Sequence, residues 1–365
     1  MTQSTSIVRV FRHPAESRES VESVALMVGA AGFLLGALIA TLFFWGGAVP
    51  IAGPGSLGQL VAVCSAIVAL AVVVWARMLV RPRRAVAESE PRLRWFDTAA
   101  IALTYAMIAL LGWVGVAAVL AESFVDAVVF PFSAALLAGV GVALTAYVVF
   151  LSAVHLTPIH LSLVLALFLV VGMLTSMLSA ADPHWWQKNL SSLGMTDDLS
   201  ARAFNLTLII AGALVTTIAN FATASLPADT DEERRHRRFV RVALMLIGVL
   251  LACVGIFPVD ESLQLHNLSA TGMAIVYVTL VLRLRTLIPS TPRVFLLVGY
   301  VFVGVIVLLA VLFITGYYNL TAVELVLAVL VFSWLIVFMR NQGLSPQQPP
   351  PAGAASAAPS TTGVA

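Results

Sequence analysis

Residues 159–181 of the chain read IHLSLVLALFLVVGMLTSMLSAA, a stretch that contains no Asp, Glu, Lys or Arg. A helix of about 20 apolar residues crosses the roughly 30 Å hydrocarbon core of a bilayer, so this stretch predicts a transmembrane helix. Comparable stretches recur along the whole chain of 365 residues, of which 60% are hydrophobic and only 10% charged. Soluble domains carry roughly 25% charged residues. The composition therefore predicts an all-α, polytopic integral membrane protein.

Apolar runs separated by polar breaks predict ten transmembrane helices. Positive charge tests this number, because the cytoplasmic loops of membrane proteins are enriched in Lys and Arg. With both termini in the cytoplasm, eighteen of the twenty Lys and Arg residues fall on the cytoplasmic side, and only Lys188 and Arg202 face outward. This asymmetry favours ten helices with a cytoplasmic N-terminus and C-terminus. The predicted spans are 24–48, 57–79, 98–120, 131–154, 159–181, 203–224, 240–258, 269–288, 294–316 and 321–339.

The spans divide the chain into four parts. A cytoplasmic N-terminal segment (1–23) precedes a four-helix membrane region (24–154) and a six-helix membrane domain (159–340). The last residues (341–365) are rich in Pro and Ala without an apolar period, which predicts a disordered cytoplasmic tail. Nineteen Arg against one Lys is typical of a GC-rich bacterial genome. The expected location is therefore the bacterial plasma (inner) membrane.

The longest outward loop contains the polar segment DPHWWQKNLSSLG (182–194), which holds the one lysine of the chain, Lys188. Its two tryptophans, Trp185 and Trp186, are typical of the membrane interface, where aromatic rings lie among the lipid headgroups. On an outward face that is otherwise acidic, Lys188 and Arg202 are the positive charges available to an anionic headgroup. This loop is the first candidate for a binding site.

A recurring triplet points to the same face. Asn205, Asn267 and Asn319 each begin an Asn-Leu-Ser/Thr triplet at the outward start of a predicted span. Asn is a favoured N-cap, and helix N-termini carry a partial positive charge that attracts phosphate. The predicted headgroup-binding residues are Lys188, Asn189, Arg202, Trp185, Trp186, Asn205 and Asn267.

A second polar segment, FPVDESLQLHN (257–267), is predicted to form another outward loop. Histidines and carboxylates from the two loops suit either a zinc ion that activates water or a serine that attacks an ester. Neither HExxH nor GxSxG occurs, so no metal and no cofactor is predicted, with zinc as the alternative. The candidate catalytic residues are His184, His266, Asp182, Asp260 and Ser192, and the first four are also the candidate zinc ligands.

Short motifs at helix boundaries resemble the bacterial membrane family catalogued as domain of unknown function 998, over roughly residues 159–340. Its members show a Ser-x-Leu-Gly loop, a Phe-Asn at the next helix start, and a Phe-Pro followed by a His after a later helix. The layout is similar to the Frag/DRAM/Sfk group, which implies a role in membrane lipid organisation. The chain resembles ceramidase-type hydrolases more weakly, because it lacks their His-x-x-x-His pair. The positions that match the motifs of domain of unknown function 998 are Ser192, Leu193, Gly194, Phe204, Asn205, Phe257, Pro258 and His266.

Three functional hypotheses follow. The first is a lipid- or envelope-associated membrane protein whose outward loops form a headgroup-binding cap, with membrane lipids as partners and no nucleic acid. The second is an extracytoplasmic hydrolase or transferase that acts on a lipid or cell-envelope substrate. The third is a transporter, which the absence of charged residues from the helix centres disfavours. Protein partners are left open.

Overall fold

The structure, a computed structural model, describes residues 18–84, 95–224 and 226–343. Over these residues it forms ten long helices, each long and apolar enough to cross a membrane. The prediction of an all-α polytopic membrane protein is confirmed. The helices are α2 (Arg18–Phe43), α3 (Leu57–Arg84), α4 (Trp95–Ser123), α5 (Pro131–Val154), α6 (Pro158–Leu178), α7 (Leu199–Ala224), α8 (Asp231–Ile256), α9 (Val259–Leu287), α10 (Arg293–Ile314) and α11 (Leu320–Gly343).

The expected cytoplasmic N-terminal segment and disordered tail fall largely on residues 1–17 and 344–365, which lie outside the described residues. Six residues assigned to the first segment belong to α2, which begins at Arg18. Their cytoplasmic location remains a prediction.

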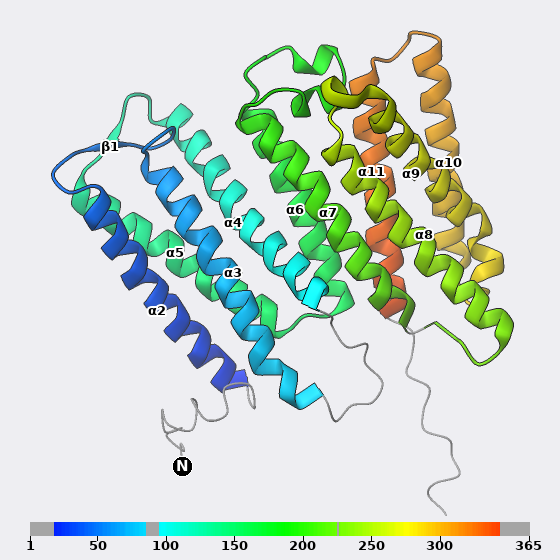
Figure 1. Cartoon of the computed structure of the whole chain (residues 1–365), viewed down its shortest axis with the longest axis horizontal. Helices are drawn as coiled ribbons and strands as arrows, with labels where there is room; N and C mark the ends of the chain where they lie inside the picture. Colours follow the sequence, from blue (N-terminus) through cyan, green and yellow to red (C-terminus); the bar gives the residue numbers. More distant parts are fainter. Residues whose placement is uncertain (1–17, 85–94, 225, 344–365) are drawn as a thin grey trace, which may run out of the picture.

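The first four helices form one group and the last six another, side by side (Figure 1). In the first group α2 packs along α5, and α3 packs against α4 and α5. Two-residue strands, β1 (Val49–Pro50) and β2 (Val128–Val129), pair antiparallel across the loops at one end of this group. In the second group α7 lies between α6 and α8, with α9 on α8 and α11 on α6. Helix α4 joins the groups because it contacts both α6 and α7.

Small residues bring α7 and α8 into close contact. A Cβ atom placed on Gly248 would lie 2.6 Å from the carbonyl oxygen of Gly212 and 2.5 Å from the Thr216 hydroxyl oxygen. Glycine is therefore required at Gly248 for this approach of the two backbones. Such small-residue contacts are a common way for helices to associate in membranes, where apolar surface alone gives no preference for protein over lipid.

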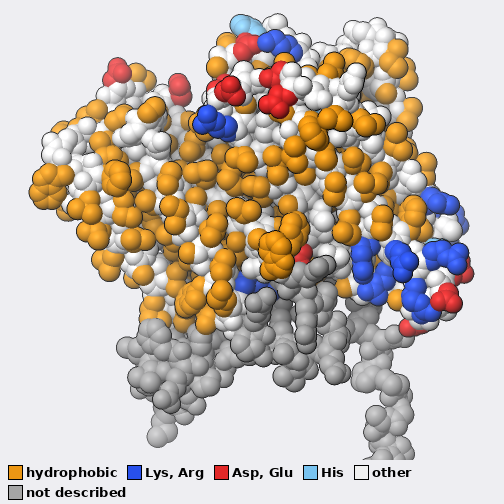
Figure 2. All heavy atoms as spheres, viewed as in Figure 1, with side chains coloured by type: hydrophobic (Ala, Val, Ile, Leu, Met, Phe, Trp, Pro, Cys, Tyr) orange, Lys and Arg blue, Asp and Glu red, His pale blue; other side chains and the backbone are white. Residues whose placement is uncertain are grey.

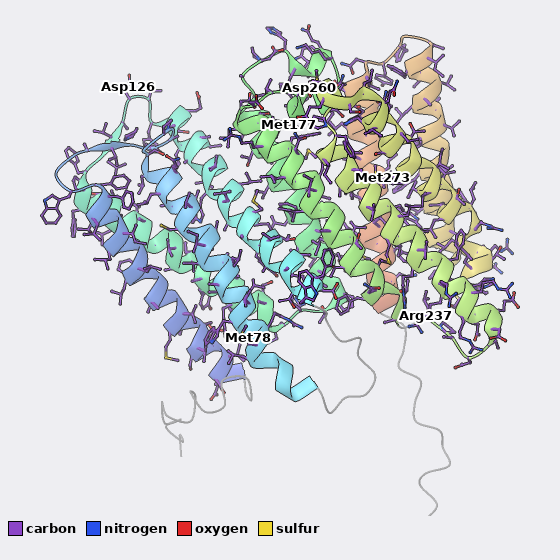
Figure 3. The ribbon with its side chains drawn as sticks, viewed as in Figure 1. Met78, Asp126, Met177, Arg237, Asp260 and Met273 are labelled. Carbon is purple, nitrogen blue, oxygen red and sulfur yellow. The ribbon has the colours of Figure 1, made fainter. Side chains whose placement is uncertain are left out.

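Apolar side chains cover the middle of the molecule, whereas charged side chains gather toward its two ends (Figure 2). Helix α10 is the most exposed of the ten helices, because only 6% of its most apolar 18 residues are buried. Figure 3 shows Asp126 and Asp260 at one end of the helices and Arg237 at the other. An apolar belt between charged ends is the surface expected of helices surrounded by lipid.

Several helices begin earlier than predicted, among them α8, which begins at Asp231 and not at 240. Two of these starts bear on the site. Helix α9 begins at Val259, so the predicted loop 257–267 is mostly helix, with a kink at Ser262 (φ −154°, ψ 81°). Polar residues suggested a loop, but Asp260 and Glu261 lie in the first turn of α9, where acidic side chains interact favourably with the helix dipole. Helix α7 likewise begins at Leu199 and not at 203.

The observed helix starts test the prediction that three asparagines cap helices. Asn205 and Asn267 lie inside α7 and α9, so the prediction that they cap helices is wrong. Asn319 does cap α11, because its side-chain oxygen accepts a hydrogen bond from the amide of Ala322 at 3.0 Å. The interpretation that outward helix N-termini gather around these asparagines therefore holds at one of three positions.

Candidate functional site: a cap over the ends of α9 and α11

The polar segment between α6 and α7, residues 179–198, folds into a compact element that we call the cap. It contains two short 3-10 helices, η1 (Trp185–Gln187) and η2 (Leu190–Gly194). The Ser192 hydroxyl bonds within the cap, to the carbonyl oxygens of Asn189 (2.7 Å) and Trp185 (3.1 Å). The Asn205 side-chain amide donates to the carbonyl oxygen of Gly194 at 3.0 Å and fastens the end of η2 to α7.

The cap meets α9 through a buried pair of side chains. His266 is 4% exposed and Ser191 is 9% exposed. His266 Nε2 lies 3.1 Å from Ser191 Oγ, and His266 Nδ1 lies 2.9 Å from the carbonyl oxygen of Phe257. The histidine therefore bridges the kinked start of α9 and η2, although the two segments are far apart in the sequence.

A carboxylate from α11 completes the arrangement. Glu324 accepts a hydrogen bond from the backbone amide of Leu190. The amide and the hydroxyl of Ser191 also interact favourably with this carboxylate. Ser191 thus lies between a histidine of α9 and a glutamate of α11. We call Ser191, His266 and Glu324 the polar trio.

A second contact with α11 lies at the rim of the cap. The Asn319 side-chain amide donates to the carbonyl oxygen of Trp186 at 3.2 Å. Trp185 is half-buried and packs against the helix core, whereas Trp186 is 50% exposed. One tryptophan anchors the cap and the other is free to contact lipid headgroups, as aromatic residues do at membrane interfaces.

Asp182, His184 and Lys188 lie together on the outer surface of the cap. The Asp182 carboxylate accepts a hydrogen bond from the amide of His184 (2.9 Å) and forms an ion pair with Lys188 Nζ at 3.0 Å. The His184 amide and the Lys188 ammonium hold the pKa of the Asp182 carboxyl below its ordinary value. The Lys188 and His184 side chains remain 63% and 69% exposed. This cluster is open to solutes, unlike the polar trio.

The residues predicted from the sequence therefore separate into two places. Asp182, His184 and Lys188 lie on the exposed surface of the cap, and His266 lies beneath it. Asp260 is exposed on the first turn of α9. The other predicted headgroup-binding residues also differ: Asn189 and Asn205 are half-buried, and Arg202 and Asn267 are exposed.

Two members of the trio were not among the candidates chosen from the sequence. The serine that faces His266 is Ser191, and its neighbour Ser192 bonds inside the cap. The Ser-x-Leu-Gly pattern was the available signal, because in SSLG the spacing assigns its serine to Ser191. Glu324 is the one acidic residue of α11, which was a weaker signal.

The hydrogen bonds of His266 bear on the zinc hypothesis. Both ring nitrogens of His266 are hydrogen-bonded to protein atoms, which leaves neither directed at a metal. Over the described residues, no three or more His, Cys, Asp or Glu side chains gather in a group suited to a metal ion. The polar trio supplies one imidazole, one hydroxyl and one carboxyl group.

A recess between α7, α8 and α11 lies away from the cap. It is lined by Val215, Ile218, Ala219, Leu244, Leu335 and Met339. Every lining side chain is apolar, whereas transporter sites near the middle of the membrane use polar groups and unwound helices to hold their substrates. This recess gives the transporter hypothesis no support.

Ten membrane-length helices with a structured polar cap define the chain as a multi-pass α-helical membrane protein. Residues 162–341 match the model of a family described as Protein of unknown function (DUF998). The match covers nearly all of the last six helices, and the resemblance inferred from the boundary motifs is confirmed over these residues. The cap and all three residues of the polar trio lie inside the matched region. No curated protein and no solved structure matches the chain significantly.

Proposed function

We propose that this protein is a lipid-associated protein of the bacterial plasma membrane, whose cap faces outward and binds an anionic headgroup of a lipid or envelope glycolipid. The observation that carries the proposal is the cap itself. It is a folded polar element held over the ends of α9 and α11, with an exposed ammonium at its surface. A loop that only joined two helices would need neither a buried network nor an interfacial tryptophan pair.

Lys188 is the group that would meet the headgroup. Its partner, Asp182, is itself exposed, and exposed ion pairs are weak because water screens them. A phosphate can therefore replace the carboxylate at the ammonium. The amide of His184 would keep Asp182 in place after the exchange, since it donates to the other carboxylate oxygen.

The ion pair between Lys188 and Asp182 provides a test, because removing the charge of either residue should change lipid labelling in opposite directions. Purified protein in lipid nanodiscs is irradiated with photoactivatable phosphatidylglycerol or phosphatidylcholine, and cross-linked peptides are quantified by mass spectrometry. We expect the anionic lipid to label the cap peptide preferentially. Lys188→Ala should lower this preference, and Asp182→Asn should raise it, because the ammonium loses its internal competitor.

Lys188→Arg is the matched control, because it keeps the charge and should keep the labelling. If Asp182→Asn and Lys188→Ala both lower the labelling, the ion pair serves only to order the loop. Equal labelling of the cap by both lipids would contradict the proposal directly.

A further inference from the structure

We infer that Ser191 and His266 form a nucleophile and base pair for acyl transfer from an ester. The substrate class, an ester of a lipid or envelope molecule, rests on the proposed function. The pairing of the two side chains does not, since it is a property of the described residues alone.

The protonation of His266 follows from its partners. A carbonyl oxygen only accepts hydrogen bonds, so the nitrogen that faces Phe257, Nδ1, carries the ring proton. In the neutral ring the other nitrogen, Nε2, then has the free lone pair, and it points at Ser191 Oγ from 3.1 Å. The Ser191 hydroxyl has one proton, and in the attacking arrangement it donates this proton to Nε2; its alternative acceptor is the Glu324 carboxylate. This orientation lets the base take the serine proton as the nucleophile attacks.

The neighbours of the pair support the same chemistry. The Phe257 carbonyl fixes the orientation of the ring, which is the task of the third group in a nucleophile–base–orienter arrangement. Glu324 is held by the Leu190 amide and interacts with Ser191. It helps to hold Ser191 beside the histidine.

The position of the pair matches the position of ester bonds in a bilayer. The trio lies where α9 and α11 begin, beneath a cap that carries the interfacial Trp185 and Trp186. Glycerolipid esters lie at the same boundary between headgroup and hydrocarbon. The low exposure of Ser191 and His266 means that the cap is closed over them, so a substrate reaches Ser191 when the cap lifts from α11. Closure afterwards excludes water from the reacting groups.

The reaction balances with the groups present. Ser191 Oγ attacks the ester carbonyl carbon while its proton moves to His266 Nε2. The ester C–O bond breaks, the leaving alcohol takes the proton from His266, and the acyl group remains on Ser191. An incoming water or alcohol then gives its proton to His266 and attacks the acyl-serine, which releases an acid or a new ester and restores the hydroxyl proton.

A phosphonylating serine probe tests the inference on the full chain in nanodiscs. A fluorophosphonate should add one phosphonyl group to the peptide that contains Ser191, as read by intact and peptide mass spectrometry. Ser191→Ala should abolish the adduct, and His266→Gln should slow its formation about 10²-fold or more. Ser192→Ala is the matched neighbour and should leave labelling intact. Thermal unfolding in the same nanodiscs identifies any variant that has lost its fold.

Access to the closed pair is tested with Asn319→Ala, which removes the side-chain bond between α11 and the cap. This variant should be labelled faster than the wild type. If Ser191 stays unlabelled in both proteins while a soluble serine hydrolase in the same tube reacts, the inference is overturned. Photo-cross-linking of anionic lipid to the cap should be unchanged by Ser191→Ala, so failure of the acyl transfer inference is distinct from failure of headgroup binding.

Discussion

The contact between α7 and α8 gives a prediction whose magnitude follows from the structure. In Gly248→Ala the new Cβ would lie 2.6 Å from the Gly212 carbonyl oxygen, about 1 Å inside an ordinary contact. The obstacle is backbone, so the two helices must move apart, and overpacking of this kind costs about 1–3 kcal/mol. Replacing a helical glycine by alanine also gains about 0.5–1 kcal/mol of backbone entropy and helix propensity. We expect a net loss of about 1–2 kcal/mol in the free energy of unfolding.

Gly304→Ala is the matched control. Gly304 lies in α10, and a Cβ placed there meets nothing within 4 Å. This variant keeps the propensity gain without the overlap, so it should be about 0.5–1 kcal/mol more stable than the wild type. Unfolding by SDS in mixed micelles, followed by circular dichroism, measures both. Equal stability of Gly248→Ala and Gly304→Ala would refute the argument that close backbone contact holds α7 to α8.

Two further predictions concern the ends of the helices. Asn319→Ala should destabilise the protein by about 0.5–2 kcal/mol because it removes a helix cap, whereas Asn267→Ala, inside α9, should cost nothing measurable in the same SDS titration. With cytoplasmic termini, a membrane-impermeant thiol reagent should label His184→Cys on intact cells and Ser290→Cys only after permeabilisation, in a background without the native cysteines. The reverse pattern would invert the orientation.

The ten helices were predictable because each follows from composition over a window of about 20 residues. Their ends were less predictable, as α9 demonstrates. Asp260, Glu261 and His266 are polar, and a rule based on apolar runs excludes them from a helix that extends past the hydrocarbon core. The α9 start depends on local helix electrostatics and on packing against the cap, and a hydropathy window records neither.

Only the approximate location of the site was predictable from the sequence, and the identity of all its residues was not. Outward polar segments pointed to His266 and to the serines of the cap, but the choice between Ser191 and Ser192 depends on the turn of η2. A 3-10 helix rotates each successive residue by about 120°, so adjacent serines face different partners. Glu324 was hidden for another reason. It lies 58 residues beyond His266, and only the packing of α11 beside the cap brings it to Ser191.

The trio also differs from a purely structural polar contact in the same region. Ser176 and Ser200 lie between α6 and α7, where each hydroxyl donates to the carbonyl oxygen of the other residue (3.0 and 2.8 Å). That reciprocal pair satisfies itself and uses no titratable group.

The polar trio instead buries a histidine whose lone pair points at a hydroxyl, and it adds a carboxylate from a third element. Burying such groups costs free energy that apolar side chains of similar size would not, and hydrogen bonds must offset this cost. Departures of this kind from the best packing are expected where a site does chemistry. Because α6 to α11 supply every group of the trio, we expect the reaction to belong to the matched six-helix region, with α2 to α5 attached to it through α4.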